Sequence, residues 1–387
     1  MVTENKEHHD KDVDIVLAMP FSFEWESNDD GYKTPNILQR ICSLFKNVRP
    51  GSDLSRYQIP VMFNVPKSQL QCLGEKVYAA NEDLLRRCAE GENALERMTR
   101  VVGWSISTIR PLPFGAAPFN PILGETHHVS RGALNVILEQ VSHHPSVFAC
   151  HATDENSNVE LQWCDSYLPK FHGATIEVYI DSKRRLSLLD KGETYVMNYP
   201  NLVIKLLPVT GTEWVGTVKI KCQESGLEAE LCYKSSSILH KGSKRSIKGK
   251  IFHSLSSKAL YEVHGHWDRI VLIKDLSNEK VEVLYDAHKA ISRLHSASVM
   301  DIEGVSRSES ARVWAKVNRG IMSKDWDGAQ EAKRAIEEKQ RELRRERNSK
   351  GEEWKAKHFN VSYSKGNGWD CSPKEKTVPR APIVYSV

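Results

Sequence analysis

The sequence has no apolar run long enough to cross a membrane, because no stretch approaches the roughly eighteen consecutive apolar residues that a spanning helix requires. Residues 1–14 are mostly charged and polar, unlike a secretory signal. Eight cysteines are present, but they are scattered without close pairs, which is typical of reduced thiols. These absences predict a cytoplasmic protein that contacts membranes only peripherally.

The sequence also lacks the charge excess of a nucleic-acid-binding protein and the motifs of common enzymes. Its 54 Lys and Arg against 50 Asp and Glu leave a formal charge of +4, which suits contact with an anionic membrane rather than with nucleic acid. It contains no Gly-x-Ser-x-Gly elbow, glycine-rich phosphate loop or dinucleotide fingerprint. Ser142 beside His143 does not indicate hydrolysis, because sequence neighbours rarely share a hydrogen bond of catalytic geometry. We expect neither an enzyme nor a cofactor.

Short runs of alternating apolar and polar residues fill the chain from about residue 101 to residue 286. Such alternation gives each run one apolar side, and short connections without helices favour antiparallel pairing in a barrel or sandwich. In a closed sheet, one set of side chains must line the interior. The clearest runs are 175–180, 213–221, 228–233, 250–253 and 279–285.

Helical patterns flank these strands, so the predicted fold class is mainly β with flanking helices (α+β). Residues 68–89 and 92–99 are expected to form two helices separated at Gly91, and residues 325–347 a strongly charged helix. The residues that follow carry aromatic side chains amid polar ones and are expected to strap onto the body. These aromatic residues are Trp354, Phe359, Tyr363 and Trp369.

An amphipathic helix is predicted near the N-terminus. Thr34 suits the N-cap, Pro35 suits the first helical position, and Pro50-Gly51 ends the pattern. Its apolar face has two interpretations: a helix packed permanently on the core, or a lid that excludes water from a cavity and touches a bilayer when open. The face comprises Ile37, Leu38, Ile41, Leu44, Phe45 and Val48.

The segment Glu139-Gln-Val-Ser-His-His-Pro-Ser-Val-Phe-Ala149 places two imidazoles in an apolar, β-prone run. Histidines titrate near neutrality and are awkward to bury, and Pro145 favours extended geometry at His144 and removes a ladder donor. His143 and His144 are therefore expected at a strand end, at the mouth of a cavity.

Three roles are open for the two histidines: structural residues, metal ligands or phosphate ligands. A metal is disfavoured, because neighbours on a regular strand point to opposite faces and no further ligands stand at suitable spacing. A phosphate monoester fits better, since its second pKa of about 6 and the imidazole pKa of about 6.5 let each group stabilise charge on the other.

Lys333, Glu337 and Arg341 are spaced four residues apart and share one face of the charged helix. By itself this spacing is typical of an intrahelical salt-bridge ladder. A basic stretch at 241–250 is likewise open to two interpretations, a solvated hairpin or a membrane-facing patch.

Three blocks of the sequence together resemble one family. The run Glu-Gln-x-Ser-His-His-Pro is similar to the fingerprint of the oxysterol-binding-protein-related lipid-transfer proteins. Pro118-Phe-Asn-Pro-Ile-Leu-Gly-Glu125 resembles a second block of that family, and Lys333-Arg-Ala-Ile-Glu-Glu-Lys-Gln-Arg341 resembles a third. The blocks occur in the family's order, and the similarity runs from about Asn36 onward. The chain resembles most the short, plant-type members that consist of the lipid-binding domain only.

The resemblance implies a large, incomplete antiparallel β-barrel that encloses a lipid tunnel, with an N-terminal helical lid and a C-terminal helical and strap region. Residues 1–33 would be a flexible N-terminus, and residues 34–387 a single lipid-binding domain. Within that domain the expected parts are a lid at 34–58, a helical segment at 59–100, the barrel at 101–290 and the C-terminal part at 291–387. The implied lid and sterol contacts are Ile37, Leu38, Ile41, Leu44 and Phe45.

The resemblance also implies a headgroup site for a phosphoinositide of the phosphatidylinositol 4-phosphate (PI4P) type. Lysine and arginine would bind phosphate directly, while Glu337 would hold them in register or accept a hydroxyl. The implied site residues are Asn120, Glu125, His143, His144, Lys333, Glu337 and Arg341, and no metal is expected.

Three departures from the family pattern bear on this site. Ala117 and Ala174 stand where the family commonly has lysines, and Ser146 stands where a second proline is usual. Each missing ammonium group removes about 1.5–3 kcal/mol of charge-assisted hydrogen bonding, so weaker phosphate binding is expected.

The function implied by the resemblance is sterol binding and non-vesicular sterol transfer, with a phosphoinositide competing for the same cavity. The alternatives are a carrier of a phospholipid such as phosphatidylserine, and a lipid-gated sensor or scaffold without net transfer. The expected partners are a sterol, a weakly bound phosphoinositide and peripheral membrane surfaces. An endoplasmic-reticulum adaptor is a further candidate partner, although no clear acidic Phe-Phe tract is found. A monomer is expected, located in the cytoplasm and peripherally on the endoplasmic reticulum or other membranes.

Overall fold

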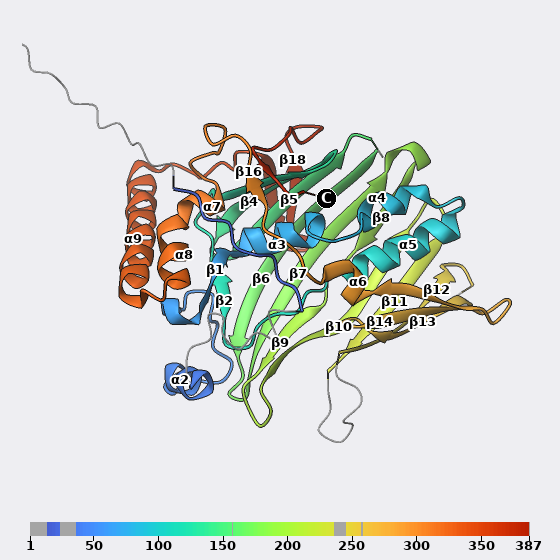
Figure 1. Cartoon of the computed structure of the whole chain (residues 1–387), viewed down its shortest axis with the longest axis horizontal. Coiled ribbons are helices and arrows are strands. Elements are labelled where there is room, and N and C mark those ends of the chain that lie inside the picture. The colour runs from blue at the N-terminus through green and yellow to red at the C-terminus, as the bar shows by residue number, and fades with distance from the viewer. Residues whose placement is uncertain (1–13, 24–35, 157, 236–244, 257, 387) are drawn as a thin grey trace, which may run out of the picture.

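One large, curved antiparallel sheet dominates the computed structural model, which describes residues 14–23, 36–156, 158–235, 245–256 and 258–386 (Figure 1). Its fifteen strands are β3 (Thr126–Arg131), β4 (Leu134–His143), β5 (Ser146–Asp154), β6 (Val159–Phe171), β7 (Thr175–Leu188), β8 (Glu193–Met197), β9 (Asn201–Lys205), β10 (Gly211–Cys222), β11 (Leu227–Lys234), β12 (Ser246–His253), β13 (Ala259–His266), β14 (Ile270–Asp275), β15 (Val281–Asp286), β16 (Ser298–Val299) and β19 (Ile383–Val384).

The sheet follows the chain strand by strand from β3 to β15, and β8 and β9 both pair with β7 and β10. At its other end, β19 joins β3 in parallel and β16 joins β19, so the C-terminus returns to the first strand of the series. Because the path ends at β15 and β16 without rejoining, the barrel is incomplete. The predicted class, mainly β with flanking helices, is confirmed.

Helices line one face of the sheet and one end of the molecule (Figure 1). They are α2 (Ile37–Leu44), α3 (Gln69–Tyr78), α4 (Leu84–Arg87), α5 (Ala94–Ser107), α6 (Ala287–Ile291), α7 (Ser310–Val313), α8 (Ala315–Met322) and α9 (Trp326–Lys350), with short 3-10 turns η1 (Val61–Phe63), η2 (Cys88–Glu90) and η3 (Leu189–Lys191). Two smaller sheets pair β1 (Asn64–Ser68) with β2 (Ala117–Phe119) and β17 (Phe359–Ser364) with β18 (Gly368–Pro373).

The core lies between the concave face of the sheet and helices α3 and α5. On β11, Leu227, Ala229, Leu231 and Tyr233 are buried in strict alternation with more exposed neighbours, as period-two patterning requires. These side chains share one apolar cluster with residues of α3 and α5. The helices therefore occupy much of the space that the curved sheet surrounds.

Helix α5 corrects the predicted start of the strands. It continues to Ser107, past residue 101, where extended structure was expected. Val101, Val102 and Ile106 are β-branched, which favours extended backbone, but each is fully buried on the side of α5 that faces the core. Tertiary packing outweighs their weak intrinsic preference for extended backbone.

The predicted helix at 68–89 is also divided. Ser68 caps α3, with its hydroxyl accepting from the backbone N–H of Leu70 and the Gln71 side chain accepting from the backbone N–H of Ser68. The helix ends at Tyr78, and α4 and η2 follow as separate short turns.

The amphipathic helix near the N-terminus begins at Ile37, while Thr34 and Pro35 lie outside the described residues. Ile41 and Phe45 are buried, and the Phe45 ring stacks on Phe171 of β6 with centroids 5.1 Å apart. Helix α2 is thus seated on the rim of the sheet at the end of β6.

The C-terminal residues do strap onto the body. Phe359 and Cys371 of the β17–β18 hairpin join Val147 and Cys164 in a buried cluster on the outer side of β4, β5 and β6. Phe359 is buried and Trp369 partly buried against this cluster, whereas Trp354 and Tyr363 remain exposed.

Two sequence-based expectations about membranes can be compared with the described residues. In that part of the chain, no helix has both the length and the apolar character needed to span a bilayer. Residues 241–244 of the basic stretch at 241–250, including Lys241 and Lys244, lie outside the described residues, whereas Lys248 and Lys250 lie on β12.

Candidate functional site

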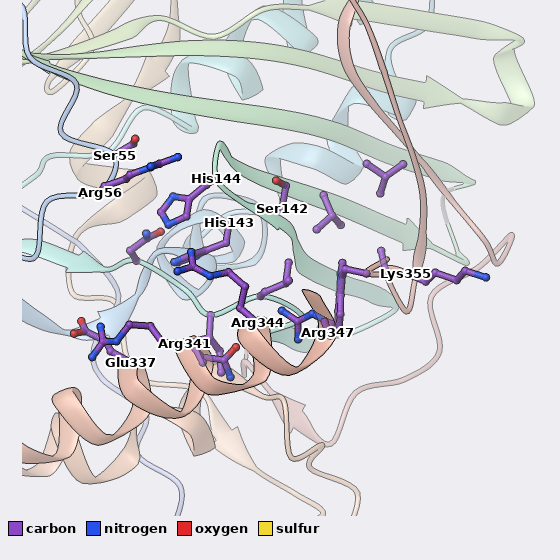
Figure 2. Close-up of a pocket in the computed structure, with 18 of the residues that line it drawn as sticks. Ser55, Arg56, Ser142, His143, His144, Glu337, Arg341, Arg344, Arg347 and Lys355 are labelled. Atoms are coloured by element: carbon purple, nitrogen blue, oxygen red, sulfur yellow. The ribbon is translucent and has the colours of Figure 1, made fainter. Parts of the chain in front are cut away.

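A cleft of about 1070 Å³ lies between the β4–β5 hairpin, helix α9 and the C-terminal strap (Figure 2). Its lining carries more positive than negative charge: seven Lys or Arg side chains and two histidines face two glutamates. These are Arg56, Lys333, Arg341, Arg344, Arg347, Lys355, Lys374, His143 and His144, together with Glu337 and Glu352.

The two histidines lie where the sequence predicts them, at the end of a strand on the rim of the sheet. Strand β4 ends at His143, and β5 begins at Ser146. The assumption that neighbouring histidines point to opposite faces was wrong, because His144 already belongs to the turn. Their ring centroids are only 4.5 Å apart, and both line the cleft.

Burial and neighbouring cations lower the pKa values of both histidines. Burial, reinforced by His144 and Arg344, lowers the pKa of His143 to about 4, against a hydrogen bond to the backbone carbonyl of Pro121 that raises it. The pKa of His144 is also lowered, first by burial and then by Arg56 and Arg344. Both rings are therefore neutral at pH 7, and an anion in the cleft would raise their pKa values.

Glu139, from the same motif as the two histidines, binds the C-terminal strap and does not line the cleft. The Glu139 carboxylate is fully buried and accepts hydrogen bonds from the backbone N–H groups of Lys357 at 2.7 Å and His358 at 2.8 Å. Burial raises its pKa, and these two bonds oppose that shift. The motif thus joins the histidine hairpin to the segment that forms the far wall of the cleft.

Some residues of the Pro118–Glu125 block line the cleft, and others support the structure behind it. Asn120 is exposed in the cleft, where its Oδ1 lies 3.4 Å from the Ser146 hydroxyl. Gly124 has a φ of +80°, and a Cβ there would meet the Trp354 ring at 2.5 Å, so only glycine fits.

Glu125 is not brought into the cleft. It is fully buried and accepts from the hydroxyls of Ser68 and Ser310, from the Trp314 indole and from the backbone of Ile122. These contacts join β1, α7 and the loop before β3. The implied headgroup residue is therefore placed as a structural support behind the site.

Helix α9 brings Lys333, Glu337 and Arg341 to the cleft, as their spacing predicts. Lys333 is buried; its ammonium donates to Asn64 Oδ1 at 3.0 Å and to the carbonyl of Ile59, and lies 3.8 Å from Glu337. Burial lowers its pKa, and Glu337 opposes that effect. Arg341 pairs with Glu338 at 2.7 Å.

Five further cations of the lining were missed by the sequence reasoning: Arg56, Arg344, Arg347, Lys355 and Lys374. Arg344 and Arg347 continue the face that begins at Lys333, so the helical period could have indicated them. Arg56 follows helix α2, and Lys355 and Lys374 come from the strap, so tertiary structure alone brings these three to the cleft.

The departures from the family pattern fall outside or at the edge of the cleft. Ala117 lies on β2 and Ala174 in the turn before β7, and neither is among the lining residues. Ser146 begins β5, where its hydroxyl donates to the His143 carbonyl at 3.3 Å as well as to Asn120. The extra cations occupy other sides of the same cleft.

Guanidinium and ammonium groups with neutral imidazoles suit a phosphate-bearing ligand, which would receive hydrogen bonds and charge compensation at once. Within the described part of the chain, no three His, Cys, Asp or Glu side chains are grouped so as to hold a metal ion. The fold and the cleft together define a class, a ligand-binding β protein whose polar site lies at the rim of its sheet.

Comparisons with known proteins show the family to which this ligand-binding β protein belongs. A family model described as oxysterol-binding protein matches residues 41–378. Oxysterol-binding protein-related protein 4C of Arabidopsis thaliana is 50% identical over 374 residues, covering 96% of this chain and 98% of that protein. Oxysterol-binding protein-related protein 8 of Homo sapiens is 34% identical over 334 residues, covering 83% of this chain and 37% of that protein. The chain belongs to the oxysterol-binding protein family.

Solved structures agree on the fold. The Osh1 ORD domain in complex with cholesterol matches with a TM-score of 0.74 at 19% identity, covering 93% of this chain and 90% of that one. The Osh3 ORD in complex with PI(4)P from Saccharomyces cerevisiae matches with a TM-score of 0.68 at 21% identity, covering 94% and 95%. The resemblance to a short, plant-type member is confirmed, and membership of a lipid-binding family supports the expectation that the chain is not an enzyme.

Proposed function

We propose that this protein binds a sterol inside the curved sheet and transfers it between membranes without vesicles, with a PI4P-type phosphoinositide competing through the cleft. The observation that carries the headgroup part is the histidine pair facing seven cations across one cleft. Family membership and the cholesterol and PI(4)P named in the titles of the similar structures support the choice of ligands.

Helix α2 is proposed as the lid. Its partly or fully buried apolar residues Ile37, Leu38, Ile41, Leu44 and Phe45 would cover the bound sterol and meet a bilayer when α2 lifts. Tyr57 connects lid and cleft, because it lines the cleft while its hydroxyl donates to the Leu44 carbonyl at 2.8 Å. A headgroup that displaces Tyr57 would therefore loosen the lid.

A phosphatidylserine-type carrier is the second candidate, because several polar atoms in the core have no hydrogen-bond partner among the described residues. The unpartnered atoms include Arg110 Nε and Nη1 and the hydroxyls of Tyr233 and Tyr285, all fully or almost fully buried. Such atoms favour a ligand with polar groups of its own, since an unpaired buried donor costs about 1–3 kcal/mol. A lipid-gated sensor would use the same ligands without net transfer.

The proposed cellular setting follows from this activity. The protein would act as a monomer in the cytoplasm, binding peripherally to the endoplasmic reticulum or other membranes through α2 and basic residues. An endoplasmic-reticulum adaptor would supply further targeting.

The test is binding of a fluorescent sterol, with PI4P-containing phosphatidylcholine liposomes as competitor. Wild-type protein should release sterol as PI4P is added, whereas His143→Ala/His144→Ala should keep sterol and resist the competitor. Sterol binding that PI4P leaves unchanged would contradict exchange, and absence of sterol binding would move a phospholipid ligand to first place. Transfer between two vesicle populations then separates a carrier from a sensor.

A further inference from the structure

Two cysteines from distant parts of the sequence meet where the C-terminal strap lies on the sheet. Cys164 is on β6 and Cys371 on β18, and β18 packs against β5 and β6 (Figure 1). Both are free thiols buried in the apolar cluster on the outer side of the sheet. Their thiols are in hydrogen-bond contact. The two sulfur atoms are therefore close enough for a reaction between them.

The β17–β18 hairpin is held on the sheet by side chains. In the described part of the chain it forms a two-stranded sheet of its own. Phe359 is buried in the outer cluster, and the Lys183 ammonium of β7 donates to the Trp369 carbonyl at 3.1 Å. Arg185 and Asp370 form a 3.8 Å ion pair, but both side chains are about half exposed, so the pair contributes little. A hairpin without ladder bonds to the main sheet opens at lower free energy than the strands within that sheet.

The same hairpin forms part of the wall of the cleft. Phe359, Val361 and Trp369 line the cleft from this side, whereas Cys164 and Cys371 are not among its described lining residues. A bond between the two sulfurs would therefore fix this wall without occupying the cleft, whichever ligand the cleft binds.

We propose that Cys164 and Cys371 form a reversible disulfide when a peroxide is present, and that this bond fastens the strap to β6. One thiol attacks hydrogen peroxide, the O–O bond breaks, and a sulfenic acid and one water form. The second thiol then attacks that sulfur, and the S–O bond breaks with release of a second water. The two sulfurs lose two electrons, which the peroxide takes up. A thiol such as glutathione reverses the bond through a mixed disulfide.

The environment of the pair sets the order of these steps. The hydrogen bond with Cys371, and then burial, raise the pKa of Cys164, and a protonated thiol is a poor nucleophile. Oxidation should therefore begin at Cys371 when the hairpin lifts from the sheet and exposes it. The sulfenic acid no longer offers the thiol–thiol contact that is the main cause of the raised pKa. When the hairpin returns to the sheet, Cys164 can complete the bond.

The experiment treats the full chain with a modest excess of hydrogen peroxide and maps its cysteines by mass spectrometry without reduction. We expect linked peptides carrying Cys164 and Cys371, lighter than the reduced peptides by the two thiol hydrogens and separated again by dithiothreitol. Hydrogen exchange in residues 359–373 should slow by at least about tenfold relative to reduced protein, because the bond prevents opening of the hairpin. Exchange in α3 and α5 should stay unchanged.

Two cysteine variants serve as test and matched control. Cys371→Ser should lose both the linked peptides and the slower exchange. Cys232→Ser, at a half-buried position of β11, should keep both. Circular dichroism of the reduced proteins verifies that both variants are folded.

Two results would overturn the proposal. Oxidation at other cysteines, or to a sulfinic acid at Cys371, without the link to Cys164 would show that the two thiols only fill space in the buried cluster. A link that leaves hydrogen exchange of the hairpin unchanged would show that the bond does not restrain the strap.

Discussion

At the scale of single residues, the environment of His143 lowers the pKa of its imidazole, so the ring is neutral until an anion binds near it. His143 lies near the Arg344 cation and packs against the His144 ring, with ring centroids 4.5 Å apart. Its pKa of about 4 in the folded protein is below the value of about 6.5 expected for an unfolded chain. A bound phosphate would reverse that shift, so headgroup binding should take up protons and strengthen as the pH falls.

The same pKa predicts how stability depends on pH. Between about pH 6.5 and pH 4 the unfolded state binds the proton first, so the contribution of His143 to stability is present at neutral pH and is lost as the pH falls, by about 2 kcal/mol at pH 5. His143→Asn should therefore lose less stability than wild type between pH 7 and pH 5, as measured by urea unfolding.

The control for this measurement is His264→Asn, an exposed histidine on β13. It should leave the pH dependence of unfolding as it is in wild type. If His143→Asn also matches wild type at both pH values, the histidine titrates normally in the fold and the argument from burial is wrong.

At the scale of elements, α2 packs in a peripheral apolar cluster that is separate from the main core. Its cluster centres on Phe45, which stacks on Phe171 and lies 5.4 Å from the Tyr57 ring. The central helices α3 and α5, by contrast, belong to the large core cluster. An element held by a small peripheral cluster opens at lower free energy than the core does.

Phe45→Ala should therefore release α2 without unfolding the sheet. We expect faster hydrogen exchange in α2 and the Ser55–Ile59 segment, unchanged protection in α3 and α5, and faster sterol dissociation, by about tenfold or more for a lost buried aromatic ring. Hydrogen exchange read by mass spectrometry measures the first two effects. Cys42→Ala, at an exposed position of α2, is the control, and global loss of protection in Phe45→Ala would show that α2 is part of the core.

At the scale of the whole molecule, the sheet does not close and therefore has edges. Strand β15 is a terminal strand of the path, and Val281 and Val283 on it are 50% and 60% exposed. An exposed apolar edge strand offers unpaired backbone groups to a second chain. The edge strand β15 is therefore a candidate site for self-association of the protein.

Val281→Lys/Val283→Lys should reduce self-association at high concentration, because charge on an edge strand opposes pairing. Since both positions are exposed, the free energy of unfolding should change by less than about 0.5 kcal/mol per site. Sedimentation velocity over a range of concentrations measures the first effect and urea unfolding the second. Equal association of variant and wild type would place the contact on another surface.

Much of the architecture could be predicted, because alternation and helical period are local properties of the chain. The strands, the charged helix and the rim position of His143 followed in this way. Helix α5 did not, because Val101 and Ile106 favour extended backbone locally and are helical only through packing. The structural roles of Glu125 and Glu139 could not be predicted either, because their hydrogen-bond partners lie far away in the sequence.

The sequence by itself determined the mainly β fold, the family and the two halves of the candidate site, because these depend on periodicity and on short motifs. Only the tertiary structure decided which charges meet there. It placed Glu125 behind the site, engaged Lys333 and Arg341 with acidic neighbours, and brought Arg56 and Lys355 into the cleft. The physical reason is that burial and electrostatic pairing depend on distances in space between segments that the sequence keeps far apart.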